Sequence, residues 1–377
     1  MKTNQLILAA ALVALAACTK DSIDYNANTL DNEIGFNAVT KKATKANNAI
    51  ISGVTYGTEN TFQVWGWQSQ KDGNSDENIA FSDIANDATS NFMTNLTISY
   101  CGGPQNRDDA WRNSAHYYYW PFTGKISFLA IHPSTVTPNV PKWDSQNAKP
   151  KVTIDDYTIS TTNSTTDLMF AVAAGSKDSG LDAQGKLGLV FKHALSQIVV
   201  NVKTDADYTA DVKFDINSVE FNKIDLSGDL AYQNEIIEWT DNDTQTQNWM
   251  YYNSVKENVN NTAAKYGAEV LMIPQDANAD VASTTDVIEG TTLTISYSMQ
   301  QLPLANNAKI TGTVVVAAPW AKVKEGTTVH DPAVAIPGWE AGKKYVYTLN
   351  FKLNEILFSP AVTDWVEVDL TTIDIVG

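Results

Sequence analysis

Cysteine is scarce in this sequence. Its 377 residues contain two cysteines, Cys18 and Cys101. This excludes a small domain stabilised by several disulfides, so stability must come from a packed core. Cys101 precedes Gly102-Gly103-Pro104, and we expect it to be a small residue at a strand end, with a reactive thiol as the less favoured alternative.

Positive charge is also in short supply. The chain has 26 Lys and Arg residues against 43 Asp and Glu residues, a formal net charge of −17. Arginine occurs only at Arg107 and Arg112. An acidic chain is repelled by phosphates and by anionic lipid head groups, so nucleic acid is excluded as a partner.

The longest apolar run is at the N-terminus, from Leu6 to Ala17, and follows Lys2. It is too short for a membrane-spanning helix, which needs about 20 apolar residues. Its charged start, apolar middle and small-residue exit are typical of a secretory signal. Leu15-Ala16-Ala17-Cys18 resembles a lipobox. We therefore predict a signal peptide at residues 1–17 and a lipid on Cys18; an ordinary signal peptide cut after Ala17 is the alternative.

Motifs for catalysis or for cofactors are missing. We find no Gly-x-Ser-x-Gly elbow, phosphate loop or dinucleotide fingerprint, and the four histidines lack the close spacing of zinc sites. These histidines are His116, His132, His193 and His330. We expect no enzyme, no cofactor and no metal, and we expect His193 to be a structural hydrogen-bonding group.

Residues 72–78 carry oxygen ligands at alternate positions, as a calcium loop does. Glu77, however, stands where such loops turn on glycine. We interpret the segment as a solvated loop, and calcium binding is the less favoured alternative.

Short runs of β-branched and aromatic residues fill the rest of the chain. Several alternate with a two-residue period, for example at 212–216 and 345–351, which places one class of side chain on one sheet face. No long segment shows a helical stripe. The sequence predicts an all-β chain of two sandwiches.

The domain organisation follows from composition. Residues 18–48 are mostly polar, with one apolar patch at 34–36, and predict a tether that holds one short strand. We place an N-terminal sandwich at 49–205 and a C-terminal sandwich at 206–377, divided at the polar segment 204–207. A division within 175–185 remains an alternative.

Aromatic residues gather in the first half of the chain. Trp65 and Trp67 share one strand face, and Tyr118 and Trp120 share another. Exposed rings would stack on sugars, whereas buried ones would form the core, and we favour the core. The full set is Trp65, Trp67, Trp111, Tyr117, Tyr118, Tyr119 and Trp120.

Several segments together resemble the fimbrillin family, the lipoprotein-derived subunits of type V pili in Bacteroides-type bacteria. Their order covers nearly the whole chain after Cys18. They are Glu33-Ile34-Gly35-Phe36, Phe62 to Trp67, Trp111 with Tyr118 to Pro121, Ile126 to Pro133, Asp167-Leu168-Met169, Leu189 to Ile198, Trp339 to Tyr347, and Val362 to Trp365.

The resemblance implies two tandem transthyretin-like Greek-key sandwiches, anchored to the outer membrane through the lipid on Cys18. It also implies polymerisation: a protease removes the N-terminal strand, and the vacated groove accepts a strand from the next pilus subunit. Strand addition buries apolar side chains and pairs free backbone groups together. The residues concerned are Ile34 and Phe36 as inserted side chains, Lys41, Lys42 and Lys45 as processing sites, and Trp365, Val366, Val368 and Leu370 in the donor strand.

One departure from the family pattern concerns processing. Well-known members are cut after arginine, but both arginines here lie well inside the first domain. The alternatives are cleavage at a lysine, or a member that keeps its lipid as an anchor. A stalk, tip or base role stays open, as does the identity of a host glycan or protein ligand. A glycan-binding surface lipoprotein and an enzyme with two converging carboxylates are the competing functions.

Overall fold

The computed structural model of the protein describes residues 32–40, 56–69, 81–102, 110–159, 166–241, 247–276, 292–302, 309–317, 323–325, 328–330, 338–352 and 356–364. Strands dominate this part of the chain, which also contains one short 3-10 helix, η1 (Phe81–Asp83). The all-β prediction is confirmed. None of the helices described has the length and apolar character needed to cross a membrane.

Seven strands of the N-terminal half form a closed ring. In spatial order they are β1 (Phe36–Thr40), β4 (Ala110–Arg112), β3 (Met93–Cys101), β2 (Phe62–Gln68), β5 (Ile126–His132), β8 (Met169–Gly175) and β9 (Leu187–His193), with β9 pairing back to β1. Alternate residues of β2 point into the ring, so Phe62 and Val64 join its core. Trp65 and Trp67 therefore face outwards from the ring into a second core.

A four-stranded sheet covers that outer face and connects the two halves of the molecule. Its order is β13 (Ile236–Asp241), β12 (Ser227–Gln233), β7 (Lys149–Thr158) and β6 (Lys142–Asp144). Trp67 packs there against Trp143 of β6, with ring centroids 6.0 Å apart. The hairpin β12–β13 belongs to the C-terminal half by sequence but pairs with a strand of the N-terminal half.

Two further sheets form the C-terminal half. One contains β15 (Ala264–Lys265), β10 (Ser196–Thr204), β23 (Lys343–Phe351) and β24 (Ile356–Asp364), with β16 (Val270–Met272) also paired to β10. The other contains β14 (Gln247–Tyr252), β11 (Val212–Ile224), β18 (Thr292–Gln301) and β19 (Ile310–Ala317). Phe221 and Phe214 of β11 meet Tyr347 and Phe351 of β23 between the sheets. Two small ladders, β17 (Gln275–Asp276) with β22 (Gly338–Trp339) and β20 (Val323–Glu325) with β21 (Thr328–His330), complete the described strands.

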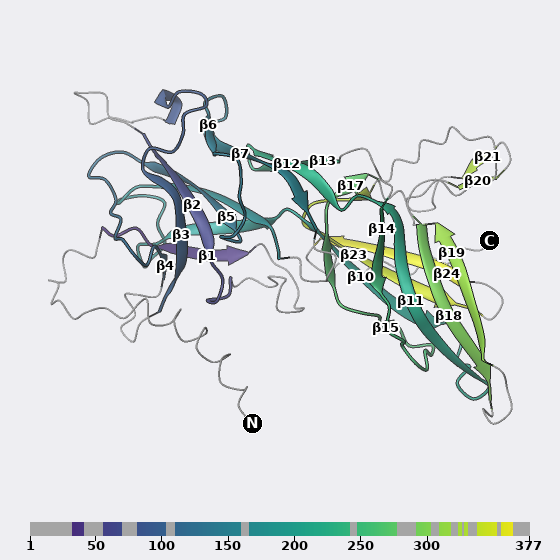
Figure 1. Cartoon of the computed structure of the whole chain (residues 1–377). Helices are drawn as coiled ribbons and strands as arrows, with labels where there is room; N and C mark the ends of the chain where they lie inside the picture. The colour runs from purple at the N-terminus through teal and green to yellow at the C-terminus, as the bar shows by residue number, and fades with distance from the viewer. Residues whose placement is uncertain are drawn as a thin grey trace, which may run out of the picture.

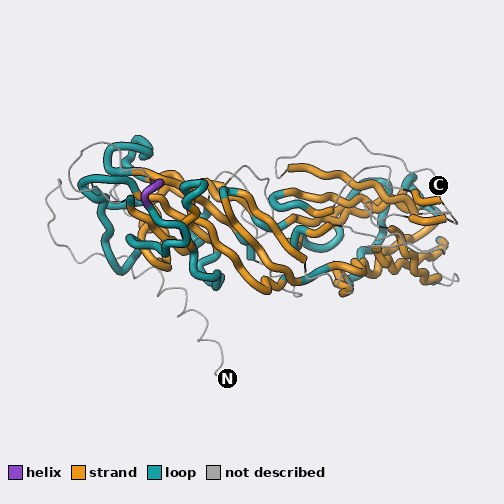
Figure 2. Tube along the Cα trace, turned by 90° about the horizontal axis from the view of Figure 1, so that it is seen from above, coloured by secondary structure: helices purple, strands orange, loops and turns teal. Residues whose placement is uncertain are grey.

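The molecule is elongated, with the ring at one end and the β11–β18–β19 sheet at the other (Figures 1 and 2). The change of partners falls between β9, which belongs to the ring, and β10, which pairs in parallel with β23. That point lies between the two divisions left open by the sequence. Residues 196–204 would fall within the predicted 49–205 domain. They form β10, which pairs with β15, β16 and β23 of the C-terminal half.

Candidate functional site

Strand β1 closes the ring and is the candidate functional element. It pairs in parallel with β9 at five positions, from Phe36↔Leu187 to Thr40↔Phe191. On its other side it pairs antiparallel with β4 at one position, Phe36↔Trp111. Without β1, the facing edges of β9 and β4 would be open.

The inward face of β1 forms part of the ring core. Phe36, Ala38 and Thr40 are buried, whereas the intervening Asn37 is exposed. The Phe36 ring meets Phe62 edge to face at 6.2 Å between centroids. Burying a large apolar side chain contributes about 1.5–3 kcal/mol. The strand is therefore held by its buried side chains as well as by its ladder to β9.

The chain leading into β1 is fixed to the loop that follows β4. The Ile34 N–H donates to the Tyr118 carbonyl, and the Trp120 N–H donates to the Asn32 carbonyl, both at 2.8 Å. A Glu33 carboxylate oxygen lies 3.7 Å from Arg112 Nη1. These contacts set the register in which Phe36 enters the core.

Near the opposite end of β1 a small buried polar cluster lies within the ring. The Tyr56 ring stacks on Phe191 with centroids 5.0 Å apart, and its hydroxyl lies 2.6 Å from His132 Nδ1. His132 Nδ1 also lies 2.9 Å from the Thr61 carbonyl oxygen. Burial lowers the pKa of His132 and raises that of Tyr56. Both side chains are thus held neutral near pH 7.

His193, at the end of β9, forms a buried pair with Asp167. Its Nδ1 lies 2.7 Å from Asp167 Oδ2, and both side chains are almost fully enclosed. The predicted structural hydrogen bond of His193 is confirmed. The pair lies where the chain passes from the ring to β10, so it stabilises that crossing. Among the described residues, no group of three His, Cys, Asp or Glu side chains is placed to hold a metal ion.

A family model described as fimbrillin-like matches residues 42–365. The chain belongs to the fimbrillin-like family. This confirms the resemblance carried by the sequence motifs and places the chain among fimbrial proteins. No curated protein sequence gives a match.

Solved structures extend the comparison to the fold of this fimbrillin-like chain. A fimbrial protein from Bacteroides vulgatus is 19% identical with a TM-score of 0.58, and the alignment covers 89% of this chain and 100% of that one. The tip fimbrial protein Mfa3 from Porphyromonas gingivalis, with a C-terminal truncation, is 10% identical with a TM-score of 0.34, over 81% and 94% of the two chains. The first of these supports a shared β-sandwich fold.

The fimbrillin-like structure describes only some of the residues singled out in the sequence. Ile34 and Phe36 are 3% and 1% exposed, with Phe36 on β1 and Ile34 just before it. The lipidation, processing, donor-strand and calcium-loop predictions lie outside the described residues. They concern Cys18, Lys41, Lys42, Lys45, Trp365, Val366, Val368, Leu370 and residues 72–78.

The aromatic residues divide into two groups. Trp65, Trp67 and Trp120 are buried, so the exposure that would favour a sugar-binding role for them is not observed. Tyr118 and Trp120 were predicted to share a strand face, but residues 117–120 belong to the irregular segment between β4 and β5, apart from an isolated bridge at Tyr119. The exposed aromatics of this segment are Tyr117, Tyr119 and Phe122.

Sequence reasoning missed the contacts that connect the hairpin β12–β13 to the ring. Glu235 accepts from Lys149 Nζ at 2.7 Å and from Lys192 Nζ at 3.0 Å, which lowers the pKa of its carboxyl. Asn234 and Glu235 both have positive φ, as a two-residue hairpin turn requires. Alternation on both sides of Asn234-Glu235 signals the hairpin, but nothing in the sequence indicates where it docks.

Proposed function

We propose that this protein is a structural subunit of a type V pilus, and that β1 is the strand exchanged between subunits. The observation that carries the proposal is that β1 alone joins β9 to β4 and closes the ring. A strand from another copy that replaced β1 would meet two open edges and an apolar groove. Strand addition of this kind obtains affinity from backbone hydrogen bonds and specificity from the pockets for alternate side chains.

The groove without β1 would be unfavourable in water. It would expose the site of Phe36, which is lined by Phe62 and Phe128, and the inward side chains of β9. Backbone groups on β9 and β4 would lose their partners at the same time. A subunit trimmed of β1 would thus be strongly driven to take up a replacement strand.

Processing in this proposal occurs directly after β1. The strand ends at Thr40, and Lys41, Lys42 and Lys45 follow, so cleavage there would release β1 from the rest of the chain. Cleavage after Arg112 would not release β1 in this way, because Arg112 lies on a ring strand, with its guanidinium facing Glu33. Cys18 would carry the lipid that holds the precursor at the outer membrane.

The C-terminal run is the proposed donor. It follows β24 and carries Val366, Val368 and Leu370 at alternate positions, after Trp365. Alternate spacing lets three apolar side chains enter one groove, as Phe36 and Ala38 do on β1. The run is therefore matched to the groove in chemical character and in period.

Peptide binding to a trimmed subunit tests the proposal. A chain beginning at Ala46 is mixed with a peptide of residues 364–377, and binding is measured by calorimetry and by the shift in Tm. The trimmed chain should bind, and the chain that retains β1 should not. The matched control is the same peptide with Val366, Val368 and Leu370 changed to Ser, which should bind at least about tenfold more weakly if the apolar side chains contribute at least about 1.4 kcal/mol.

A truncated chain tests whether the C-terminal run is the donor. The lipidated precursor ending at Asp364 should reach the cell surface without forming filaments, as seen by electron microscopy with antibody labelling. If this truncated chain still polymerises normally, the C-terminal run is not the donor. Sequencing the N-terminus of the surface protein then distinguishes a start near Lys45 from a blocked, lipidated Cys18.

A further inference from the structure

Arg112 of β4 contacts the chain at the point where it enters β1. Its Nη1 lies 3.7 Å from Glu33 Oε2, and the two side chains are only 16% and 5% exposed. The same guanidinium covers Gly35, because a Cβ at that position would lie 3.3 Å from Arg112 Nε and 3.2 Å from Ala110 Cβ. One basic side chain thus contacts two positions of the segment that precedes Phe36.

The backbone contacts of this segment do not depend on its sequence. The Leu187 N–H donates to the Gly35 carbonyl at 2.9 Å, and the Ile34 N–H donates to the Tyr118 carbonyl at 2.8 Å. Any extended strand can form such bonds, and a shift of two residues keeps the same faces inward and outward. A strand that replaces β1 therefore needs its side chains to choose between registers two residues apart.

The segment leading into β1 has a distinct order of side chains. The Glu33 carboxylate comes first and is followed by the buried Ile34. Phe36 enters the ring core three positions after the carboxylate, and the small Ala38 enters it five positions after. A replacement strand in the same direction should therefore carry a carboxylate, a large apolar residue and a small residue at these spacings.

One alignment of the C-terminal run reproduces this order in the direction of β1. It places Glu367, Val368, Leu370 and Thr372 at the positions of Glu33, Ile34, Phe36 and Ala38. The run from 364 to 377 contains four carboxylates and no lysine or arginine, so its charge is opposite to that of the guanidinium on β4.

Shifting this alignment by two residues loses the match in either direction. In one direction a threonine replaces the apolar residue in the pocket between Phe62 and Phe128. In the other, Leu370 enters the site of Ala38, and a tryptophan replaces the carboxylate that faces Arg112. Overpacking of a core and removal of the counter-charge from a buried ion are both unfavourable.

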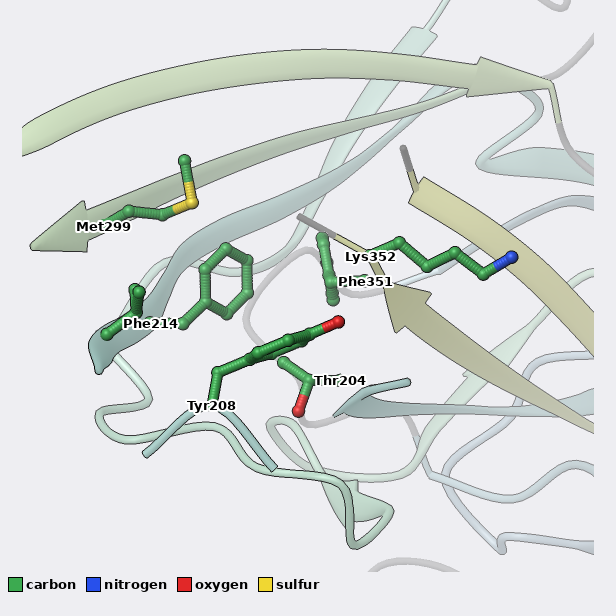
Figure 3. A pocket seen from close by; sticks show the side chains of 7 residues that line it. Thr204, Tyr208, Phe214, Met299, Phe351 and Lys352 are labelled. Atoms are coloured by element: carbon green, nitrogen blue, oxygen red, sulfur yellow. The ribbon is translucent and has the colours of Figure 1, made fainter. Parts of the chain in front are cut away.

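The C-terminal half has an apolar hollow between its two sheets, but this hollow cannot accept a side chain from another copy. Phe214, Met299 and Phe351 surround it (Figure 3), and its free volume is about 10 Å³, room for about one water molecule. The Phe36 site, by contrast, holds an entire phenyl group. The pocket suited to an incoming apolar side chain is therefore the one in the seven-stranded ring.

We propose that Arg112 sets the register of the incoming strand by binding Glu367 of the next subunit in place of Glu33. Leu370 of that strand then occupies the Phe36 pocket. The inference rests on the proposed strand exchange and adds to it the residue that selects one register. In a chain with a net charge of −17 and two arginines, such a charge pair is specific to this position.

Asp369 strengthens the pairing in this register. It follows at the position of Gly35, so its carboxylate would face the Arg112 guanidinium beside that of Glu367. The planar guanidinium has five N–H donors and can bind two carboxylates at once. The flexible Arg112 side chain would move by a few tenths of an ångström to admit the new Cβ.

A double-mutant cycle tests this assignment. The processed chain beginning at Ala46, with Arg112 or Arg112→Gln, is titrated with the peptide 364–377 carrying Glu367 or Glu367→Gln, and Kd is measured by calorimetry. Each single change should weaken binding about tenfold, and the second change should add little once the first is made. Asp374→Asn, which removes a carboxylate further along the run, is the matched control and should show no coupling to Arg112.

Charge exchange in the full chain tests the same contact in assembled pili. Glu33→Lys combined with Arg112→Glu keeps two opposite charges facing each other in the precursor. This variant should reach the cell surface but form at least about tenfold fewer filaments, because the donor carboxylate would meet a like charge. Adding Glu367→Lys should restore the filaments, whereas adding Asp374→Lys instead should not.

The outcomes separate the register from strand exchange itself. Binding of the parent peptide without coupling between Arg112 and Glu367 overturns the register assignment and leaves strand exchange standing. No binding of the parent peptide overturns both. Undiminished filaments in the charge-exchanged variant overturn the assignment, as does a surface-exposed precursor whose filaments Glu367→Lys fails to restore.

Discussion

Phe36 of β1 meets Phe128 of β5 edge to face, with ring centroids 5.2 Å apart and planes at 87°. This contact joins the closing strand to the opposite wall of the ring, because β5 is not a neighbour of β1 in the sheet. The closing strand is thus anchored across the core and along both its edges.

Phe36→Ala should lower the free energy of unfolding by about 3–5 kcal/mol, because it removes a fully buried aromatic side chain and leaves a cavity. The measurement is urea unfolding followed by tryptophan fluorescence. Asn37→Ala, the exposed neighbour on the same strand, is the matched control and should change stability by less than about 0.5 kcal/mol. Equal losses for the two variants would mean that β1 is not inserted as described.

Removing the charge of Glu235 should loosen the hairpin from the ring. Because Lys149 and Lys192 lower the pKa of this half-exposed carboxyl, its contribution is present above its ordinary pKa near 4.5 and is lost as pH falls through the lower folded value. Glu235→Gln should therefore cost about 0.5–1 kcal/mol at pH 7.

The check is a pair of unfolding curves at pH 7 and at pH 3, where the difference between Glu235→Gln and the parent should shrink. A double-mutant cycle with Lys192→Met should return a coupling energy of similar size. Asp178→Asn, whose partner Lys177 is its sequence neighbour, is a control and should show no coupling to Lys192. A difference that grows towards pH 3 would contradict the assignment.

Mild acid should destabilise the ring through His132. Burial lowers its folded pKa below the ordinary value near 6.5, so the unfolded chain binds a proton first. Stability should therefore fall as pH drops below about 6.5, until the lower folded pKa is reached. His132→Asn, which keeps a polar group near Tyr56, should reduce the slope of stability between pH 7 and 5. The exposed His116→Gln should leave that slope unchanged.

The ring and the C-terminal half, connected at β9 and β10, should unfold as one cooperative unit. Trp239 Nε1 donates to the Ala194 carbonyl at 2.7 Å, directly between β9 and β10, and its ring lies 5.7 Å from that of Tyr157. Trp239→Phe keeps the ring contact but removes the donor, and should cost about 1–2 kcal/mol. Ile236→Ala, exposed on the same hairpin, should be nearly neutral. Differential scanning calorimetry of the parent should show one transition; two well-separated transitions would contradict the shared core.

Sequence periodicity predicted the elements better than their partners. Alternation placed Trp65 and Trp67 on one buried face, and the structure confirms that both are buried. It did not indicate that the cover on this face is a sheet containing a hairpin from the other half, because docking depends on contacts between residues far apart in sequence, such as Phe170 with Tyr232. The two-residue period is local and carries no information about such pairs.

The candidate site could be predicted only in part, again because the sequence pattern is local. The apolar patch at Ile34 and Phe36 in a polar segment was enough to predict an inserted strand, since apolar side chains need a core. The parallel pairing with β9 could not be predicted, because register across a gap of that length leaves no local pattern. The exposure of Phe122 was also missed, because nothing in the sequence distinguishes one exposed phenylalanine from a buried one.

The parallel pairing of β1 with β9 also constrains the order of folding. Phe36 is made about 150 residues before Leu187, its ladder partner, and such distant contacts form late because the loop must close first. During synthesis β1, the first of the described strands, is made long before β9, with which it pairs. The ring thus stays incomplete through most of its synthesis, and the segment that completes it is the one nearest the N-terminus among its seven strands.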